Sequence, residues 1–154
     1  MKADQVKPFA QAAYDVLKEI IEGPVTRGKL SLMQSPVSVH GVVVIIGLTG
    51  GVEGRVLFDM NMETAKKIAE IMNYEEFETF NSLCRATISE LGNIIAGRAV
   101  SMLNDGGYNF NITPPVLFVG EKMETSDIVQ DTLVIPLETD HGTINVNVAL
   151  KSGK

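Results

Sequence analysis

The segment from Val39 to Leu48 is rich in β-branched residues and contains no Asp, Glu, Lys or Arg. Branched side chains fit the pleated surface of a strand better than the surface of a helix. The run from Val42 to Ile46 is continuously apolar, which is typical of a strand that is covered on both faces. This run is far shorter than the roughly 20 residues that a membrane-spanning helix needs. The sequence therefore predicts a globular domain in which other elements cover this strand.

Three segments have apolar residues at spacings of three and four, which predicts amphipathic helices. They are residues 3–22 with Asp4 as N-cap, a short helix from the cap Asn61 to Met72, and residues 81–104. Other segments have strand patterns and are separated by turn residues. The predicted strands are residues 29–34, 39–48, 55–60, 108–112, 116–119, 132–137 and 143–150, and residues 120–130 are predicted to form a polar loop.

The glycine-rich stretch between residues 47 and 54 could be interpreted as a phosphate-binding loop. That motif requires a strand that leads into a helix, with Lys and then Ser or Thr after the last glycine. Here Gly54 is followed by Arg55, Val56 and Leu57, which begin another predicted strand. The stretch therefore predicts a β-hairpin turn, and residues 140–142 predict a second one.

The predicted elements occur in an order that is used twice, with helix, strands and a hairpin in each half. A register that aligns Asn93 with Tyr14 also aligns Glu90 with Gln11, and Asn93 and Tyr14 each stand 22 positions before a proline. The sequence thus predicts an α+β fold made of two pseudo-repeats of helix-strand-strand-strand. A central, largely antiparallel sheet is expected, with the long helices packed on it. The length predicts a single domain over residues 1–154.

Glu90, Asn93 and Gly97 are expected to share one face of the helix at residues 81–104, because they stand three and seven positions apart. Polar residues on a solvated helix face are ordinary, and that interpretation stays open. However, Asn and Gly together lower helix propensity by roughly 1.5 kcal/mol relative to Ala. Gly92, Asn93 and Gly97 fall within six residues, and such local inconsistencies concentrate at functional or close-packed positions. Gly97 indicates close approach, either by internal packing or by a docked partner.

Composition excludes several classes of partner. The formal net charge is −6 and no run of five basic residues occurs, which argues against binding to nucleic acid or to an anionic membrane. Residues 1–5 contain no apolar signal segment. The single cysteine, Cys84, suits a reducing compartment, so a cytoplasmic location is expected.

The sequence contains no nucleophile beside a base and no cluster with metal-ligand spacing, so a small-molecule enzyme has little support and no metal site is expected. A carboxamide such as that of Asn93 can hold a water in line for attack on a phosphoryl group. A carboxylate one turn away, such as that of Glu90, can pair with a cationic side chain of a partner. In that chemistry the partner supplies the phosphoryl group and the Mg²⁺.

The segment from Ser89 to Arg98, followed by the segment from Gly107 to Pro115, resembles the CheX branch of the CheC/CheX/FliY chemotaxis phosphatases. The resemblance extends to the segments at residues 1–9 and 27–32, so it covers nearly the whole chain. One departure is that Ala86 stands where members of the family often have Asp or Ser.

The resemblance implies a CheC-like fold and hydrolysis of the aspartyl-phosphate of a CheY-like response regulator. In that reaction Asn93 would orient the attacking water and Glu90 would pair with a lysine of the regulator, which retains the Mg²⁺. Gly97 and Pro115 are predicted docking residues. The chain itself would bind no cofactor, and it would form a homodimer through sheet edges. The alternative is a non-catalytic binding module of the flagellar-switch type.

Overall fold

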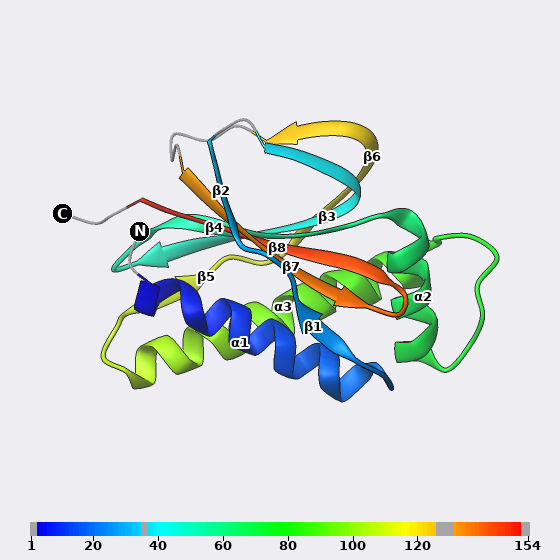
Figure 1. Ribbon diagram of the computed structural model, residues 1–154, viewed down its shortest axis with the longest axis horizontal. Helices are drawn as coiled ribbons and strands as arrows, with labels where there is room; N and C mark the ends of the chain where they lie inside the picture. Colours follow the sequence, from blue (N-terminus) through cyan, green and yellow to red (C-terminus); the bar gives the residue numbers. More distant parts are fainter. Residues whose placement is uncertain (1–2, 35–36, 126–130, 152–154) are drawn as a thin grey trace.

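The computed structural model describes residues 3–34, 37–125 and 131–151 (Figure 1). Within these residues the chain forms three helices and eight strands. In chain order they are α1 (Ala3–Ile20), β1 (Val25–Arg27), β2 (Ser31–Gln34), β3 (Val37–Gly50), β4 (Glu53–Met60), α2 (Met62–Asn73), α3 (Ser82–Asp105), β5 (Phe110–Ile112), β6 (Val116–Thr125), β7 (Asp131–Thr139) and β8 (Gly142–Lys151).

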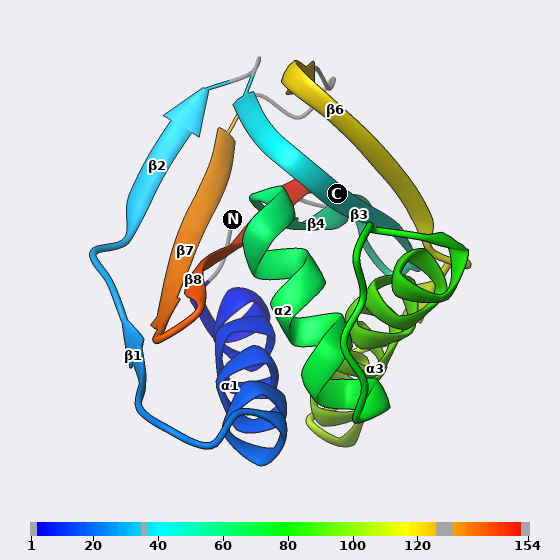
Figure 2. The ribbon, with the colours of Figure 1, turned by 90° about the vertical axis from the view of Figure 1, so that its right-hand side faces the viewer.

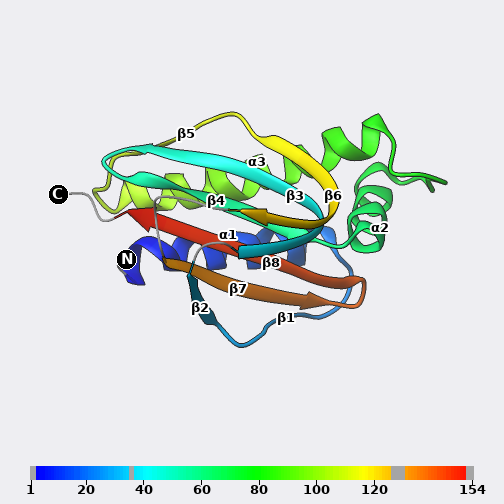
Figure 3. The same cartoon turned by 90° about the horizontal axis from the view of Figure 1, so that it is seen from above.

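The strands form one sheet in which every pairing is antiparallel. From one edge to the other the order is β1, β7, β8, β4, β3 and β5, with β2 also paired to β7 and β6 also paired to β3. Figure 3 shows β1 and β2 at one side of the sheet and β5 and β6 at the other. The predicted α+β fold with a central antiparallel sheet is therefore confirmed.

The three helices lie on the same side of the sheet (Figures 1 and 2). α1 and α3 pack against each other, and α2 packs against α3, β3 and β8. Within the described residues, no helix combines the length and the apolar character that a membrane crossing requires. α3 is thus held by the sheet and by both other helices.

The topology confirms the predicted internal repeat. If α1 and β1–β4 are exchanged one by one for α3 and β5–β8, the order β1, β7, β8, β4, β3, β5 becomes β5, β3, β4, β8, β7, β1. This is the same order read from the other edge. The two hairpins, β3–β4 and β7–β8, meet at the centre of the sheet, where β4 pairs with β8. α1 and α3 are consequently equivalent helices that lie side by side.

The long strand β3 is covered on both faces, as its apolar run predicts. Val44 belongs to the main core beneath the helices, together with Phe58 of β4. The preceding residue, Val43, points to the opposite face of the sheet, because side chains alternate along a strand. There it forms a small separate cluster with Leu57, against which Met123 packs. The hairpin turn predicted between β3 and β4 is also confirmed.

Side-chain caps fix the starts of the second and third helices. Asn61 accepts a hydrogen bond from the backbone N–H of Thr64 at 2.8 Å, which confirms the predicted cap of α2. Asn81 accepts one from the backbone N–H of Cys84 at 3.0 Å, so α3 begins where the sequence pattern does. Each bond satisfies one of the donors that the first turn of a helix leaves free.

Two expectations about local structure were wrong, and one strand was missed. Asp4 lies inside the first turn of α1 rather than at its cap, and its carboxylate accepts a hydrogen bond from the Tyr108 hydroxyl. β1 was not predicted, because only its pairing with β7 makes these three residues a strand. The predicted polar loop is wrong for residues 120–125, which extend β6 along β3, while residues 126–130 lie outside the described residues. Polar residues are accepted there because β6 is an edge strand that is held through its backbone.

Candidate functional site

Glu90, Asn93 and Gly97 form a strip on one face of α3, called the polar strip below, and the opposite face of α3 is buried. Ile88, Leu91, Ile95 and Ala99 are all no more than 2 % exposed, at the spacing that the sequence predicts. This face packs against α1 and the sheet, which leaves the strip at the surface.

Glu90 and Asn93 lie one turn apart on that surface. The Glu90 side chain is exposed and the Asn93 side chain is half-buried. Within the described part of the chain, neither side chain makes a hydrogen bond or an ion pair. Residues at this spacing on a helix lie about 5–6 Å apart at their Cβ atoms. A carboxylate and a carboxamide are therefore presented together, with their hydrogen-bonding groups available to a partner.

The two glycines near the strip have opposite surroundings. Within the described residues, a Cβ atom built on Gly97 would meet no heavy atom within 4 Å. One built on Gly92 would lie 2.9 Å from Val44 Cγ1 and 3.1 Å from Phe58 Cδ2. Internal packing therefore explains Gly92 and does not explain Gly97. Among the described residues, nothing packs against the Cβ position of Gly97, and its docking role stays a prediction.

Pro115 lies in the connection between β5 and β6, and its side chain is half-buried. The connection is anchored by Thr113, whose backbone N–H donates to Gly47 O at 3.0 Å and whose Oγ1 accepts from Gly47 N at 2.8 Å. α3 packs against both β5 and β6. Pro115 thus lies next to a segment that α3 contacts, and its docking role stays a prediction.

The equivalent positions on α1 carry different chemistry. Gln11 is exposed, but its amide donates to Asp15 Oδ1 at 2.8 Å. Tyr14 is partly buried and packs against the core. On the aligned register, α1 therefore offers neither a carboxylate nor a free carboxamide at the places of Glu90 and Asn93.

An ion pair joins α3 to α1 on the turn after Asn93. Arg98 donates to both carboxylate oxygens of Glu19, at 2.6 and 3.0 Å. The hydrogen bond and the charge of Arg98 lower the pKa of the Glu19 carboxyl, against the opposing effect of desolvation. The same bond raises the pKa of Arg98. This two-point contact links the two helices at the surface, and the sequence pattern does not predict it.

A second polar contact joins α3 to α2. The Asn73 amide donates to Ala69 O at 2.8 Å and to Thr87 Oγ1 at 2.9 Å. Thr87 in turn donates to Leu83 O at 2.8 Å. The contact lies one turn before Glu90, so α3 is tied to a neighbouring helix on each side of the strip.

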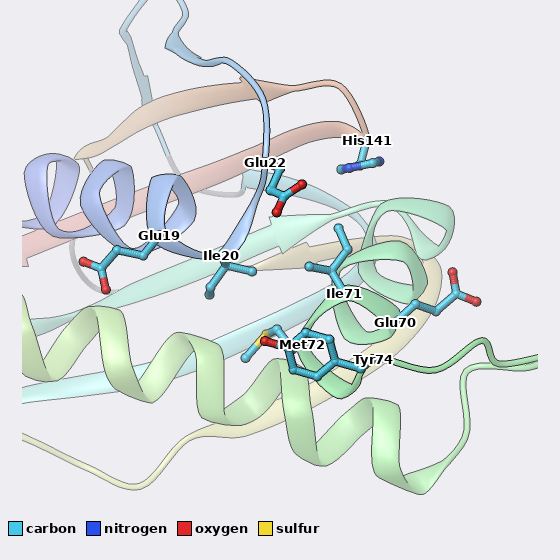
Figure 4. A pocket seen from close by; sticks show the side chains of 8 residues that line it. All are labelled: Glu19, Ile20, Glu22, Glu70, Ile71, Met72, Tyr74 and His141. Carbon is cyan, nitrogen blue, oxygen red and sulfur yellow. The ribbon is translucent and has the colours of Figure 1, made fainter.

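A cavity of about 690 Å³ lies between the end of α1, the end of α2 and the β7–β8 turn (Figure 4). Its lining residues are Glu19, Ile20, Glu22, Glu70, Ile71, Met72, Tyr74 and His141. Glu19 forms the ion pair with Arg98, and Glu70 accepts a hydrogen bond from the backbone N–H of Phe77 at 2.9 Å. That bond is the main reason why the pKa of Glu70 is lowered. Glu90 and Asn93 are not part of this cavity.

The single cysteine and the described acidic and histidine side chains could also contribute to a site elsewhere in the fold. Cys84 is buried, and its thiol lies 3.7 Å from the backbone oxygen of Thr79. Among the described residues, no group of three or more His, Cys, Asp or Glu side chains is placed to hold a metal ion.

The family model described as "Chemotaxis phosphatase CheX" matches residues 42–138 of the chain. A curated relative, the CheY-P phosphatase CheX of Thermotoga maritima, is 27% identical over 157 residues, which cover 99% of both chains.

Solved structures agree with this family match. The crystal structure of a CheX–CheY–BeF3–Mg²⁺ complex from Borrelia burgdorferi contains a chain that is 38% identical, with a TM-score of 0.85 over 98% of this chain and 100% of that one. A CheC-like superfamily protein from Shewanella sp. PV-4 is 22% identical, with a TM-score of 0.87 over 99% of this chain and 100% of that one. The second match supports the CheC-like fold.

Proposed function

The chain belongs to the CheX family of chemotaxis phosphatases, and we propose that it hydrolyses the aspartyl-phosphate of a CheY-like response regulator. The observation that carries this proposal is the pair Glu90 and Asn93. The pair lies on the surface of α3, opposite the buried face, and has no partners among the described residues. The family members named above support the choice of substrate, since one acts on CheY-P and another is seen with CheY.

In the proposed reaction Asn93 enters the active site of the regulator and holds a water molecule. Its amide group both donates and accepts hydrogen bonds, so it can orient the water without taking its proton. The water oxygen forms a bond to phosphorus while the bond from phosphorus to the aspartyl oxygen breaks. The products are inorganic phosphate and the free aspartate carboxylate. Such catalysis depends on positioning and charge stabilisation, and the Mg²⁺ of the regulator supplies part of the latter.

Glu90 fixes the orientation of the docked regulator. Its exposed carboxylate pairs with a lysine of the regulator, one turn from the amide that acts on the water. Gly97 leaves open space on the following turn, so the surface of the regulator can approach α3 closely. Pro115 borders the same region from the β5–β6 connection.

A homodimer through sheet edges is part of the proposal. β6 pairs only with β3 within the described sheet, and it exposes Val116, Phe118 and Val119. β2 at the other edge exposes Leu32 and Met33. Edge strands with exposed apolar side chains are suited to pairing with another chain. We place the protein in the cytoplasm, where Cys84 stays reduced.

The test is release of phosphate from a phosphorylated CheY-like regulator, with and without the protein. The wild-type protein should shorten the lifetime of the aspartyl-phosphate. Asn93→Ala should lower the stimulated rate at least about 10²-fold, since it removes the group that orients the water. Ser82→Ala, at an exposed position in the first turn of α3, is the control and should act as wild type. A non-catalytic binding module would hold the regulator and leave the lifetime unchanged.

A further inference from the structure

Gly92 lies where α3 crosses the centre of the sheet. It is buried, and it faces Val44 of β3 and Phe58 of β4, which are direct cross-strand partners. Val44 is fully buried and Phe58 is 2 % exposed. The backbone of α3 therefore rests on a pair of side chains that are themselves enclosed by the core.

A methyl group at Gly92 could not be accommodated in this arrangement. Its carbon would lie 2.9 Å from Val44 Cγ1, whereas carbon atoms in contact prefer about 3.5–4.0 Å. Protein interiors are close-packed, so the enclosed valine and phenylalanine have little space into which they could shift. The element that can move is α3 itself, because its other face is open to solvent.

Gly92 directly precedes Asn93, so a movement of its backbone carries the Asn93 amide with it. The two polar contacts on either side, Thr87 with Asn73 and Arg98 with Glu19, hold α3 against its neighbouring helices. Neither contact is directed at the sheet, and neither sets how far α3 stands from it.

We propose that Gly92 is a positioning residue, which sets the distance between α3 and the sheet and thereby the depth to which Asn93 reaches into the regulator. This inference rests on the proposed function. A displacement of about 1 Å in a catalytic group can lower turnover on the order of a hundredfold. The glycine is thus needed for the placement of Asn93 rather than for the formation of the helix, which Ala would favour.

The test uses Gly92→Ala, Val44→Ala and the double variant, and measures turnover on a phosphorylated CheY-like regulator. Gly92→Ala should lower kcat on the order of a hundredfold, with a smaller change in KM, while its circular dichroism stays that of the wild type. Val44→Ala removes the atom that causes the closest contact, so the double variant should recover most of the lost kcat. An effect through stability alone predicts the reverse, since Val44→Ala removes buried volume and should make the double variant the least active.

Ala65→Val is the control, because it adds bulk beneath α2, which carries none of the proposed site residues. It should lower the melting temperature without changing kcat per folded molecule. Wild-type kcat in Gly92→Ala, or a double variant no better than Gly92→Ala, would overturn the inference.

A readout without the regulator separates this inference from the proposed function. Crystal structures of the wild type and of Gly92→Ala should show Asn93 displaced from Val44 by about 0.5–1 Å, with the displacement reversed in the double variant. An unmoved helix refutes the positioning role whatever the assay gives. A wild-type protein that leaves the aspartyl-phosphate lifetime unchanged refutes the proposed function, and the displacement still decides the role of Gly92 in placing α3.

Discussion

Arg98 of α3 pairs with Glu19 of α1, 79 positions earlier in the chain. The same separation relates Glu90 to Gln11 and Asn93 to Tyr14 on the register of the internal repeat. The ion pair therefore joins equivalent positions of the two repeats at the contact between their helices. The two repeats differ at these positions. The second supplies the cation Arg98 and the Glu-x-x-Asn pair, and the first supplies the anion Glu19.

The Glu19–Arg98 pair should make stability depend on pH in a defined window. The pKa of Glu19 is lowered in the folded protein, so its contribution is present above the ordinary value of 4.5 and is lost as the pH falls through the lowered folded-state value. Glu19→Gln should therefore melt at a lower temperature than wild type at pH 7, and the difference should shrink below pH 4.5. Both side chains are largely exposed, so the effect should be small and should weaken in high salt. Thermal melts from pH 3 to pH 7 would measure it, and a constant difference would contradict this.

Glu90→Lys should weaken binding of a beryllofluoride-activated regulator. It replaces an attraction to a lysine by a repulsion, which is worth about 1–2 kcal/mol, or roughly a 5- to 30-fold change in affinity. The loss should diminish as salt is added. Glu63→Lys makes the same charge change at an exposed position of α2 and should bind nearly as the wild type does. Equal affinities for the two variants at low salt would rule out the lysine pairing.

Gly97→Leu should separate stability from function. Replacing a glycine inside a helix by a good helix former stabilises it by up to about 1 kcal/mol, and the structure offers open space for the side chain. The variant should therefore melt at or above the wild-type temperature and yet bind the activated regulator weakly, because the new side chain fills the space of the partner. Gly97→Ala should show a smaller loss. Wild-type affinity in Gly97→Leu would show that the regulator does not approach this turn.

Sedimentation equilibrium should give twice the mass of one chain, as expected for a homodimer. Phe118→Asp on β6 and Leu32→Asp on β2 place a charge on exposed apolar residues of the two edges. The variant at the edge that forms the interface should sediment as a monomer, since burying an unpaired charge is costly. A wild-type monomer, or dimers in both variants, would contradict pairing through the edges.

Local features of the fold could be predicted from the sequence because residues close in the chain decide them. Apolar spacing over residues 81–104 predicts both the length of α3 and its buried face, and Asn61 marks the start of α2 by bonding three residues ahead. The continuous apolar run in β3 predicts that both faces are covered. The presence of Glu90 and Asn93 together on one surface follows from the same helical spacing.

The sequence by itself thus determined the order of the helices and of every strand except β1, the repeat, and the place of Glu90 and Asn93 on one face of α3. Only the tertiary structure decided which glycine serves packing, since Gly92 meets Val44 and Phe58, residues that are 48 and 34 positions away. The sequence pattern showed that both Gly92 and Gly97 interrupt the same helix, and it assigned close approach to Gly97 only. Contacts between distant segments also decided that β1 is a strand and that Arg98 pairs with Glu19. Such contacts depend on how elements pack, and no periodicity within a single segment encodes them.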